Sequence, residues 1–423
     1  MSATGKPNFK HQTIWTGDNL DILRGFNSEC VDLIYLDPPF NSNANYAAPI
    51  GSQAAGAEFK DTWGLSDINL AWHGEIKHDY PGLYDLLHAT RKIHGDSMMS
   101  YLIYMAIRIM ELRRVLKPTG SIYLHCDPTA SHYLKLLMDS IFGKKQFRNE
   151  IVWHYRRWTA PSGDLQKLHD IVLWYSKDKS KRIYNTIWVL PANVEKGRSE
   201  SYEKDADGRL YRWQSNKGQK YKIYRDERGV HAGDVWPISF LHPSAKERVG
   251  YPTQKPLALL KRMIKASSNP GDMVLDPFCG CATACIAAEM EEREWVGIDI
   301  SPKAAELVER RMVEQVGVLY AGHHRTDIPQ RTDMGLMLAY NDPRNKERLY
   351  GAQGGYCNGC ETHFQPRYFE VDHIIPRSKG GTDHISNLQL LCSPCNKLKG
   401  TRSQEELLVL LTDKGWIKRK KAA

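Results

Sequence analysis

The chain has 423 residues, of which 41% are hydrophobic, so it is long enough for two or more domains and too apolar to be intrinsically disordered. Its 58 basic and 49 acidic residues give a net charge of +9, which suits a polyanionic partner. The N-terminus has no apolar signal core, and the apolar stretch 101–110 is too short for a membrane span. Composition therefore favours a soluble, cytoplasmic protein and argues against export or membrane insertion.

The first informative element is a buried parallel strand predicted over 31–36 and followed at once by Asp37, Pro38, Pro39 and Phe40. The two prolines end the strand, because neither can donate a hydrogen bond to a neighbouring strand, and they stiffen the turn. Open α/β sheets bind ligands at the carboxyl ends of their strands. The Asp37 carboxylate, the Pro38 carbonyl and the Phe40 ring suit a planar group with an exocyclic amine, such as adenine or cytosine.

Residues 177–250 lack strong periodicity. Between 196 and 228 they contain ten Lys/Arg and six Asp/Glu, interleaved with tyrosines and a tryptophan. Basic side chains bind phosphates, and aromatic side chains stack on unpaired bases. A solvated insertion that packs on its own tyrosines explains the same composition, so both interpretations stay open.

A second half-site is predicted over 273–300. The expected elements are a strand over 273–276, a tight turn over 278–283, a helix over 284–290 and a strand over 295–300. Asp276 and Asp299 lie at the ends of the two strands, and Phe278 and Gly280 lie in the turn. Such a unit holds a nucleoside cofactor in α/β folds, because the small turn lets the backbone approach the ligand and the second acid accepts from ribose hydroxyls.

Cysteine usage predicts a metal site near the C-terminus. Cys357 and Cys360 form one C-x-x-C pair, and Cys392 and Cys395 form another, with 31 residues between the pairs. In a chain without an export signal, two such pairs favour a tetrahedral structural zinc over disulfides. The segment 321–345 breaks the preceding pattern and is predicted to be a linker.

The N-terminal motifs, in this order, resemble those of amino-group DNA methyltransferases that use S-adenosylmethionine, of the permuted (beta) class. In that class the Asp-Pro-Pro-aromatic motif precedes the glycine turn, as here. The other matching segments are TGDNLDIL (16–23), FKDTW (59–63), GSIYLHCD (120–127), FRNEIVWHY (147–155), HDIVLWYS (169–176) and YPTQKP (251–256). The resemblance implies a Rossmann-like α/β domain over 1–320 with a mostly parallel seven-stranded sheet and a target-recognition region at about 177–250.

The resemblance also implies site roles. Asp37 and the Pro38 carbonyl would hold the target amine, and Phe40 would stack on the flipped base. The implied cofactor contacts are Asp18 at the adenine amino group, Asp299 at the ribose, Asp276 near the methionine end, Phe278 and Gly280 against the cofactor, and Thr253 and Lys255 along its methionine side. Ala282 stands where the family turn usually has a second glycine, so its methyl group is expected close to the ligand.

In this family an Asp at the first motif position favours adenine N6 as the target, with cytosine N4 as the alternative. Methylation of RNA or protein is a further alternative. Related motifs in those enzymes usually begin with Asn and lack the permuted order.

Residues 350–402 resemble an HNH endonuclease, a ββα-metal unit, which implies a domain over 346–423. Asp372 and Asn396 would bind Mg²⁺ or Mn²⁺, His373 would be the general base and Asn387 would orient the active-site loop. A hard ion prefers oxygen ligands, and a neutral imidazole can take a proton from water. The alternative is a zinc-stapled domain that binds DNA without cleaving it.

Together these resemblances predict a fused enzyme that methylates and cuts double-stranded DNA. Such a fusion fits a bacterial or phage restriction–modification context. The sequence leaves open whether the protein forms a homodimer.

Overall fold

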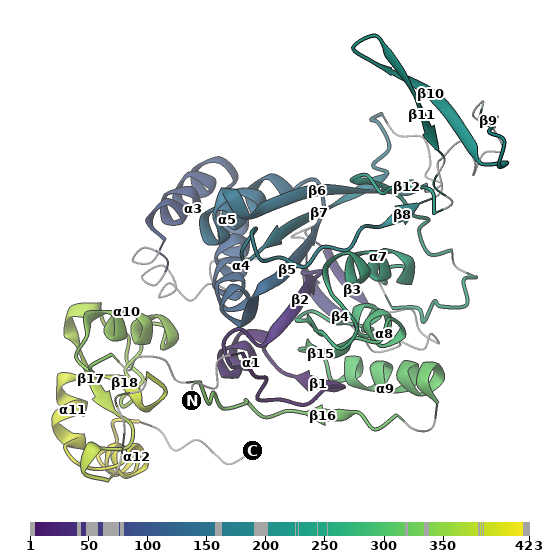
Figure 1. Ribbon diagram of the computed structural model, residues 1–423. Helices are drawn as coiled ribbons and strands as arrows, with labels where there is room; N and C mark the ends of the chain where they lie inside the picture. The colour runs from purple at the N-terminus through teal and green to yellow at the C-terminus, as the bar shows by residue number, and fades with distance from the viewer. Residues whose placement is uncertain are drawn as a thin grey trace.

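The computed structural model describes residues 5–39, 44–47, 58–61, 76, 80–156, 163–189, 202–224, 226, 228–242, 244–251, 253–317, 320–333, 338–379, 381, 383 and 385–417. Figure 1 shows a large α/β body, a hairpin that projects from it and a small C-terminal body drawn in yellow. None of the described helices has the length and apolar character needed for a membrane span.

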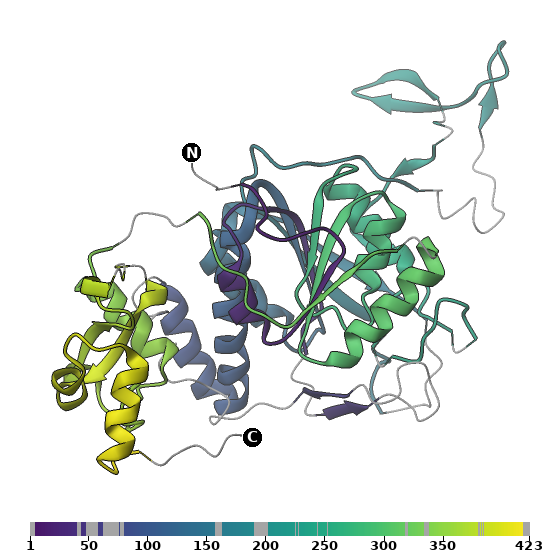
Figure 2. The same ribbon diagram turned by 90° about the horizontal axis from the view of Figure 1, so that it is seen from below.

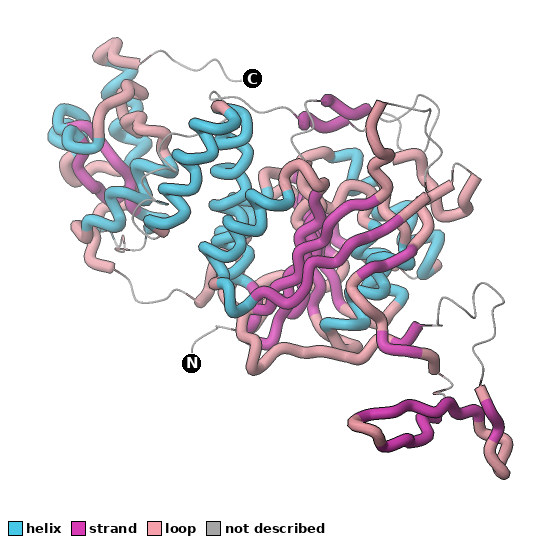
Figure 3. Tube along the Cα trace, turned by 90° about the horizontal axis from the view of Figure 1, so that it is seen from above, coloured by secondary structure: helices cyan, strands magenta, loops and turns pink. Residues whose placement is uncertain are grey.

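A nine-stranded sheet runs through the α/β body (Figure 3). All its strands are parallel except β7, which is antiparallel to both neighbours. In spatial order the strands are β13 (Val235–Pro237), β6 (Phe147–His154), β7 (His169–Ser176), β5 (Leu116–Cys126), β2 (Val31–Leu36), β14 (Met273–Asp276), β15 (Glu294–Asp299), β1 (Thr13–Thr16) and β16 (His323–Arg325). Beyond the seven predicted strands, the three-residue strands β13 and β16 extend the two edges, because β6 and β1 there offer unpaired backbone groups.

Helices cover both faces of this sheet (Figures 1 and 2). One layer consists of α1 (Asn19–Gly25), α3 (Pro81–His94), α4 (Asp96–Val115) and α5 (Ser131–Phe142). The other consists of α7 (Leu257–Ser267), α8 (Thr283–Met290) and α9 (Pro302–Val316). The fold is therefore a three-layer α/β fold with a mostly parallel central sheet, as predicted.

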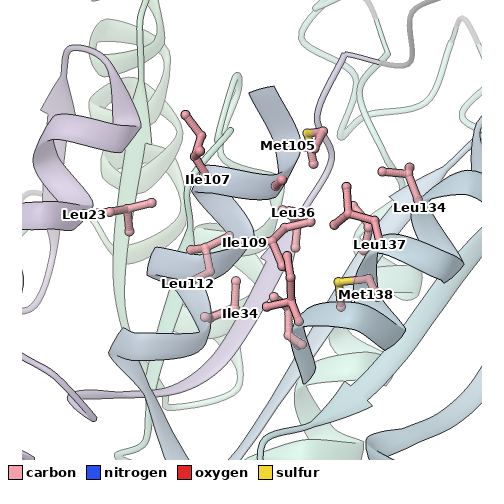
Figure 4. Close-up of a cluster of buried hydrophobic side chains, with 14 of the residues drawn as sticks. Leu23, Ile34, Leu36, Met105, Ile107, Ile109, Leu112, Leu134, Leu137 and Met138 are labelled. Carbon is pink, nitrogen blue, oxygen red and sulfur yellow. The ribbon is translucent and has the colours of Figure 1, made fainter. Parts of the chain in front are cut away.

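Strand β2 is buried on both faces, which confirms the prediction made from its apolar run. Ile34 and Leu36 pack with α4 and α5 in the first core cluster (Figure 4). Leu33 and Tyr35 belong to the second cluster, on the opposite face. Alternate side chains of a strand point to opposite faces, so a strand covered by helices on both sides needs a continuous apolar sequence.

The predicted target-recognition region contains a two-stranded hairpin. After the hairpin, the same region contributes strand β13 to the central sheet. The hairpin consists of β10 (Leu210–Asn216) and β11 (Gln219–Tyr224), with β9 (Glu203–Lys204) paired to β10. It stands away from the α/β body in both Figure 1 and Figure 2. Two further pairs of short strands are β8 (Trp188–Val189) with β12 (Val230–His231), and β3 (Ala44–Ala47) with β4 (Glu58–Asp61).

The described residues of the predicted linker, 321–333 and 338–345, make contacts at both ends of the segment. Strand β16 pairs with β1, and the Ser28 backbone N–H donates to the Asp333 carboxylate at 2.6 Å. Helix α10 begins at Pro343 and packs in the C-terminal core. The α/β body thus extends into the first half of this segment, because the edge strand β1 pairs there with β16.

The C-terminal body has the predicted ββα arrangement and its own apolar core. Its elements are α10 (Pro343–Ala352), β17 (Phe369–His373), β18 (Leu388–Cys392), α11 (Ser393–Lys399) and α12 (Gln404–Asp413). Strands β17 and β18 are antiparallel. A capping box between Ser403 and Glu406 begins α12. Short 3₁₀ helices cover 144–146, 366–368, 377–379 and 385–387.

Candidate active sites

Three acids meet at the carboxyl edge of the central sheet. Strands β2, β14 and β15 are parallel neighbours, and Asp37, Asp276 and Asp299 stand at their carboxyl ends. The first acid is far from the other two in sequence, and only the order of strands brings all three to one edge. This edge is where open α/β sheets bind ligands.

Asp37 forms a partly buried ion pair with Lys255. Its Oδ2 accepts a hydrogen bond from Lys255 Nζ at 2.6 Å, and the two side chains are 16% and 8% exposed. Its other oxygen, Oδ1, is buried and accepts no hydrogen bond from the described residues. A buried acceptor without a donor costs about 1–3 kcal/mol, so Oδ1 is the atom in this site best suited to an incoming N–H group. Pro38 and Pro39 follow directly, whereas Phe40 lies outside the described residues.

The position of Lys255 depends on the segment before α7. The amide of Gln254 donates to the Glu247 carbonyl at 2.6 Å and accepts from the Val249 N–H at 2.9 Å. Thr253 is exposed, and its carbonyl accepts from Lys255 Nζ at 3.3 Å. Lys255 was expected beside the cofactor, and sequence reasoning missed its contact with Asp37, because 218 residues separate the two.

Asp276 and Asp299 fix the glycine turn through backbone hydrogen bonds. Asp276 Oδ1 accepts from the Phe278 N–H at 3.1 Å, and Asp299 Oδ2 accepts from the Gly280 N–H at 2.8 Å. Burial raises the pKa of Asp276 well above its usual value, and the nearby Asp37 charge adds to this; burial also raises the pKa of Asp299. A cationic ligand in contact with these carboxyls would favour their ionised forms.

The turn leaves little room for a side chain at Gly280. Gly280 has φ +49°, and a Cβ atom there would lie 3.0 Å from the ring of Tyr251. Ala282 also has a left-handed backbone, with φ +54°, which costs about 1–2 kcal/mol for a residue with a side chain. Its methyl group, expected close to the ligand, is fully buried in the second core cluster. The departure from the family glycine is therefore accommodated by the core.

A buried arginine links the predicted adenine-side acid to the turn. Arg108 Nη2 donates to Asp18 Oδ1 at 2.7 Å, and its Nε donates to Asn19 Oδ1 at 2.6 Å. Asn19 in turn donates to the Pro277 carbonyl at 2.7 Å. Asp18 Oδ1 also caps α1 by accepting from the Leu20 N–H. In the sequence, Arg108 is the charged residue that interrupts an apolar stretch. A charged residue in such a stretch indicates a buried side chain with a polar partner, and here the partners are Asp18 and Asn19.

The four cysteines of the C-terminal body form one cluster. The Sγ atoms of Cys357, Cys360, Cys392 and Cys395 all lie within 4.8 Å of one another. The backbone N–H groups of Gly359 and Cys392 point at Cys357 Sγ, at 3.3 and 3.2 Å. A hydrogen bond from Cys395 lowers the pKa of Cys357 to about 5. Four cysteine sulfurs this close together fit a tetrahedral zinc ion.

The predicted ligands of the nuclease ion contact different partners. Asp372 Oδ2 accepts from the buried Lys399 at 2.9 Å and from Gln389 at 3.2 Å. The Asn396 amide donates to Glu370, which lies on the same face of β17 as Asp372. Glu370 is thus an oxygen donor beside Asn396 that sequence reasoning missed, and among the described residues no hydrogen bond joins Asp372 to Asn396.

His373 ends strand β17 beside a loop held by Asn387. The Asn387 side chain accepts from the Ile375 N–H at 2.9 Å and donates to the Ile375 carbonyl at 3.0 Å. His373 Nε2 lies 2.8 Å from Asp383 Oδ1. Sequence reasoning also missed Asp383, because no local motif joins a strand residue to an acid in the following loop.

The acid-lined sheet edge and the zinc-type ββα body define a nucleotide-modifying α/β enzyme fused to a small nuclease-like module. The DNA methylase family model matches residues 31–310, and the HNH endonuclease model matches residues 357–402. The chain belongs to the DNA methylase family: it is an amino-group (N6/N4) DNA methyltransferase with a C-terminal HNH endonuclease domain.

Two curated relatives are similar over most of this domain. Type II methyltransferase M.HpaI of Haemophilus parainfluenzae is 26% identical over 304 residues, which cover 71% of this chain and 74% of the relative. DNA adenine methyltransferase YhdJ of Escherichia coli K12 is 28% identical over 306 residues, covering 71% and 82%. A solved structure of a putative DNA modification methylase from Thermus thermophilus is 17% identical, covers 75% of this chain and 98% of its own, and has a TM-score of 0.41.

Proposed function

We propose that the N-terminal domain transfers a methyl group from S-adenosylmethionine to adenine N6 in double-stranded DNA, with cytosine N4 as the alternative target. The buried Asp37 Oδ1, which accepts no hydrogen bond from the described residues and lies beside the ion-paired Lys255, is the observation that carries this proposal. The Asp at the first motif position and the relative named as a DNA adenine methyltransferase support adenine. The permuted class is supported because β2 precedes β14 in the chain.

The proposed chemistry depends on two hydrogen-bond acceptors in the turn that follows β2. An exocyclic amine is a poor nucleophile, because its lone pair is delocalised into the ring. Hydrogen bonds to Asp37 Oδ1 and the Pro38 carbonyl would favour a pyramidal nitrogen and stabilise its developing positive charge. The base must first leave the duplex, which costs a few kcal/mol, and stacking on Phe40 would offset part of that cost.

The cofactor would lie along the acid-lined edge and would supply the electrophilic methyl group. The residues that would hold it are Asp18, Thr253, Lys255, Asp276, Phe278, Gly280 and Asp299. The buried Asp276 and the half-buried Asp299, whose pKa values are raised, suit a positively charged ligand, which would favour their ionised forms.

Transfer of a labelled methyl group from S-adenosylmethionine to DNA and RNA, followed by nucleoside analysis, tests this proposal. The expected product is N6-methyladenine in duplex DNA. N4-methylcytosine would overturn the choice of base but keep the reaction class. Label in RNA alone would overturn the proposal.

We propose the β10–β11 hairpin as an arm that contacts DNA. Residues 208–224 contain five Lys/Arg and no Asp/Glu. Trp213 lies opposite Lys222 in the hairpin register and is 51% exposed. The Lys222 ammonium lies 4.0 Å from the centre of the Tyr211 ring, so basic and aromatic groups share one face. A two-stranded ribbon fits the major groove, and this charge suits its phosphates.

Lys220→Gln combined with Lys222→Gln is expected to weaken DNA binding. The slope of log affinity against log salt concentration should become shallower by about 0.9 for each phosphate that the variant no longer neutralises. Methyl transfer at saturating DNA should change little. Fluorescence anisotropy over a salt series measures both quantities. Lys303→Gln with Arg310→Gln, on the surface of α9, makes the same charge change as a control. Equal losses of affinity in the two double variants would contradict a specific arm.

The HNH domain is proposed to cleave DNA with Mg²⁺ or Mn²⁺. Asp372 and Asn396, with Glu370 beside Asn396, would hold the ion, which would stabilise charge on the phosphate under attack. His373 would accept the proton of the attacking water. Modification and cleavage in one chain would serve a restriction–modification system.

His373→Ala is expected to lower ion-dependent cleavage by on the order of 10²–10⁴-fold and to leave methyl transfer unchanged. Gel assays on plasmid DNA with each ion measure cleavage. His363→Ala, an exposed histidine of the same domain, is the control. If the intact chain cleaves no DNA with either ion, the alternative of a DNA-binding domain without cleavage replaces this proposal.

A further inference from the structure

One carboxylate in the C-terminal body contacts the predicted general base directly. Asp383 Oδ1 lies 2.8 Å from His373 Nε2, and the two side chains are 20% and 11% exposed. An ionised carboxylate only accepts hydrogen bonds, so Nε2 must carry the hydrogen in this contact. In the neutral ring, the lone pair that can take a proton is then on Nδ1.

The Asp383 carboxylate is itself held on both oxygens. Arg377 Nε donates to Oδ1 at 2.8 Å, and a second nitrogen of Arg377 donates to Oδ2. The backbone N–H of Tyr340 also donates to Oδ2, at 3.3 Å. Because three donors besides His373 Nε2 bind this carboxylate, it cannot rotate away from the histidine without losing several hydrogen bonds.

Two further contacts restrain His373. The Tyr340 ring packs against the imidazole, with 5.1 Å between ring centres, and Lys399 Nζ donates to the His373 carbonyl at 2.6 Å. Lys399 holds the backbone and Tyr340 restrains one face of the ring. Among the described residues, Asp383 makes the contact that distinguishes the two ring nitrogens.

We propose that Asp383 is a positioning residue of the nuclease site, which holds His373 in the Nε2–H tautomer so that Nδ1 receives the proton of the attacking water. This inference rests on the proposed nuclease function. In the step concerned, the water oxygen bonds to the DNA phosphorus, its proton passes to Nδ1, and the bond from phosphorus to the leaving sugar oxygen breaks. That oxygen takes a proton from solvent.

Asp383→Asn in the intact chain tests the proposal. An asparagine amide can donate to Nε2 and so favours the Nδ1–H tautomer, which has no lone pair toward the water. The kcat for cleavage should fall by on the order of 10²–10⁴-fold with little change in KM for DNA. Asp383→Glu should restore part of the kcat, because it returns a carboxylate.

Asp342→Asn is a matched control. Asp342 also binds an arginine and accepts a backbone N–H, but both of these donors belong to Arg344 rather than to the surroundings of the histidine. Unchanged zinc content and methyl transfer show that each variant is folded. Cleavage by Asp383→Asn equal to that of the control would overturn the proposal.

Nitrogen NMR of histidine-labelled protein, at a pH where imidazole is neutral, reports the tautomer without an activity assay. The unchanged chain should show His373 as Nε2–H, and Asp383→Asn should lose this preference. An Nδ1–H ring in the unchanged chain would overturn the inference. If the unchanged chain does not cleave DNA, the nuclease proposal fails, and the spectra still decide whether Asp383 sets the tautomer.

Discussion

Asp37→Ala is expected to lower methyl transfer to DNA by on the order of 10³-fold or more and to leave affinity for S-adenosylmethionine nearly unchanged. The variant removes Oδ1, the buried acceptor proposed to bind the target amine. Asp276 and Asp299, which hold the glycine turn proposed to contact the cofactor, are unchanged. Single-turnover transfer of labelled methyl measures the first quantity, and calorimetric titration with the cofactor measures the second.

Asp37→Ala also leaves the buried Lys255 without its carboxylate, which can cost about 3–5 kcal/mol in stability. Asp37→Asn keeps the side-chain volume and separates loss of charge from loss of packing. Asp32→Asn is the matched control: it lies at the amino end of the same strand and pairs with Lys117 at 2.7 Å. Full turnover in both Asp37 variants would rule out the proposed site.

Cys395→Ser is expected to remove bound zinc and unfold the C-terminal body, with complete loss of any DNA cleavage. Zinc contributes about 10–16 kcal/mol to such small domains, more than their apolar cores supply. Methyl transfer should persist, because the two core clusters of the α/β body contain none of the four clustered cysteines. Elemental analysis for zinc and calorimetric melting measure these effects.

Cys30→Ser provides the control for this change. Cys30 is a buried thiol of the α/β body that donates to the Asn27 carbonyl, and a serine hydroxyl can replace that hydrogen bond. Zinc content should be unaffected in this variant. We expect the unchanged chain to melt in two steps, because the α/β body and the C-terminal body have separate cores. A Cys395→Ser protein that retains zinc and both steps would contradict the cysteine cluster as a structural site.

Local sequence signals predicted those features that depend on neighbouring residues. The apolar run of β2 and the two prolines after it specify a buried strand that stops at Asp37, because strand burial and chain termination are local properties. The glycine turn with its flanking strands followed in the same way, as did the paired cysteines. The resemblance to known motifs placed Asn387 in a loop-orienting role, and its bonds to Ile375 are consistent with that prediction.

Long-range contacts decided the rest. The pair between Lys255 and Asp37, the bridge from Arg108 to Asp18 and the contact of Asp383 with His373 each join separate elements. A sequence pattern specifies which face of a strand is apolar, but not which distant side chain completes a polar contact at its end. By itself, the sequence determined the strand and turn elements around Asp37 and Gly280, the order of the motifs and the pairing of the cysteines. Only the tertiary structure decided which Asp37 oxygen pairs with Lys255 and which ring nitrogen of His373 contacts Asp383. Both contacts depend on which elements pack side by side.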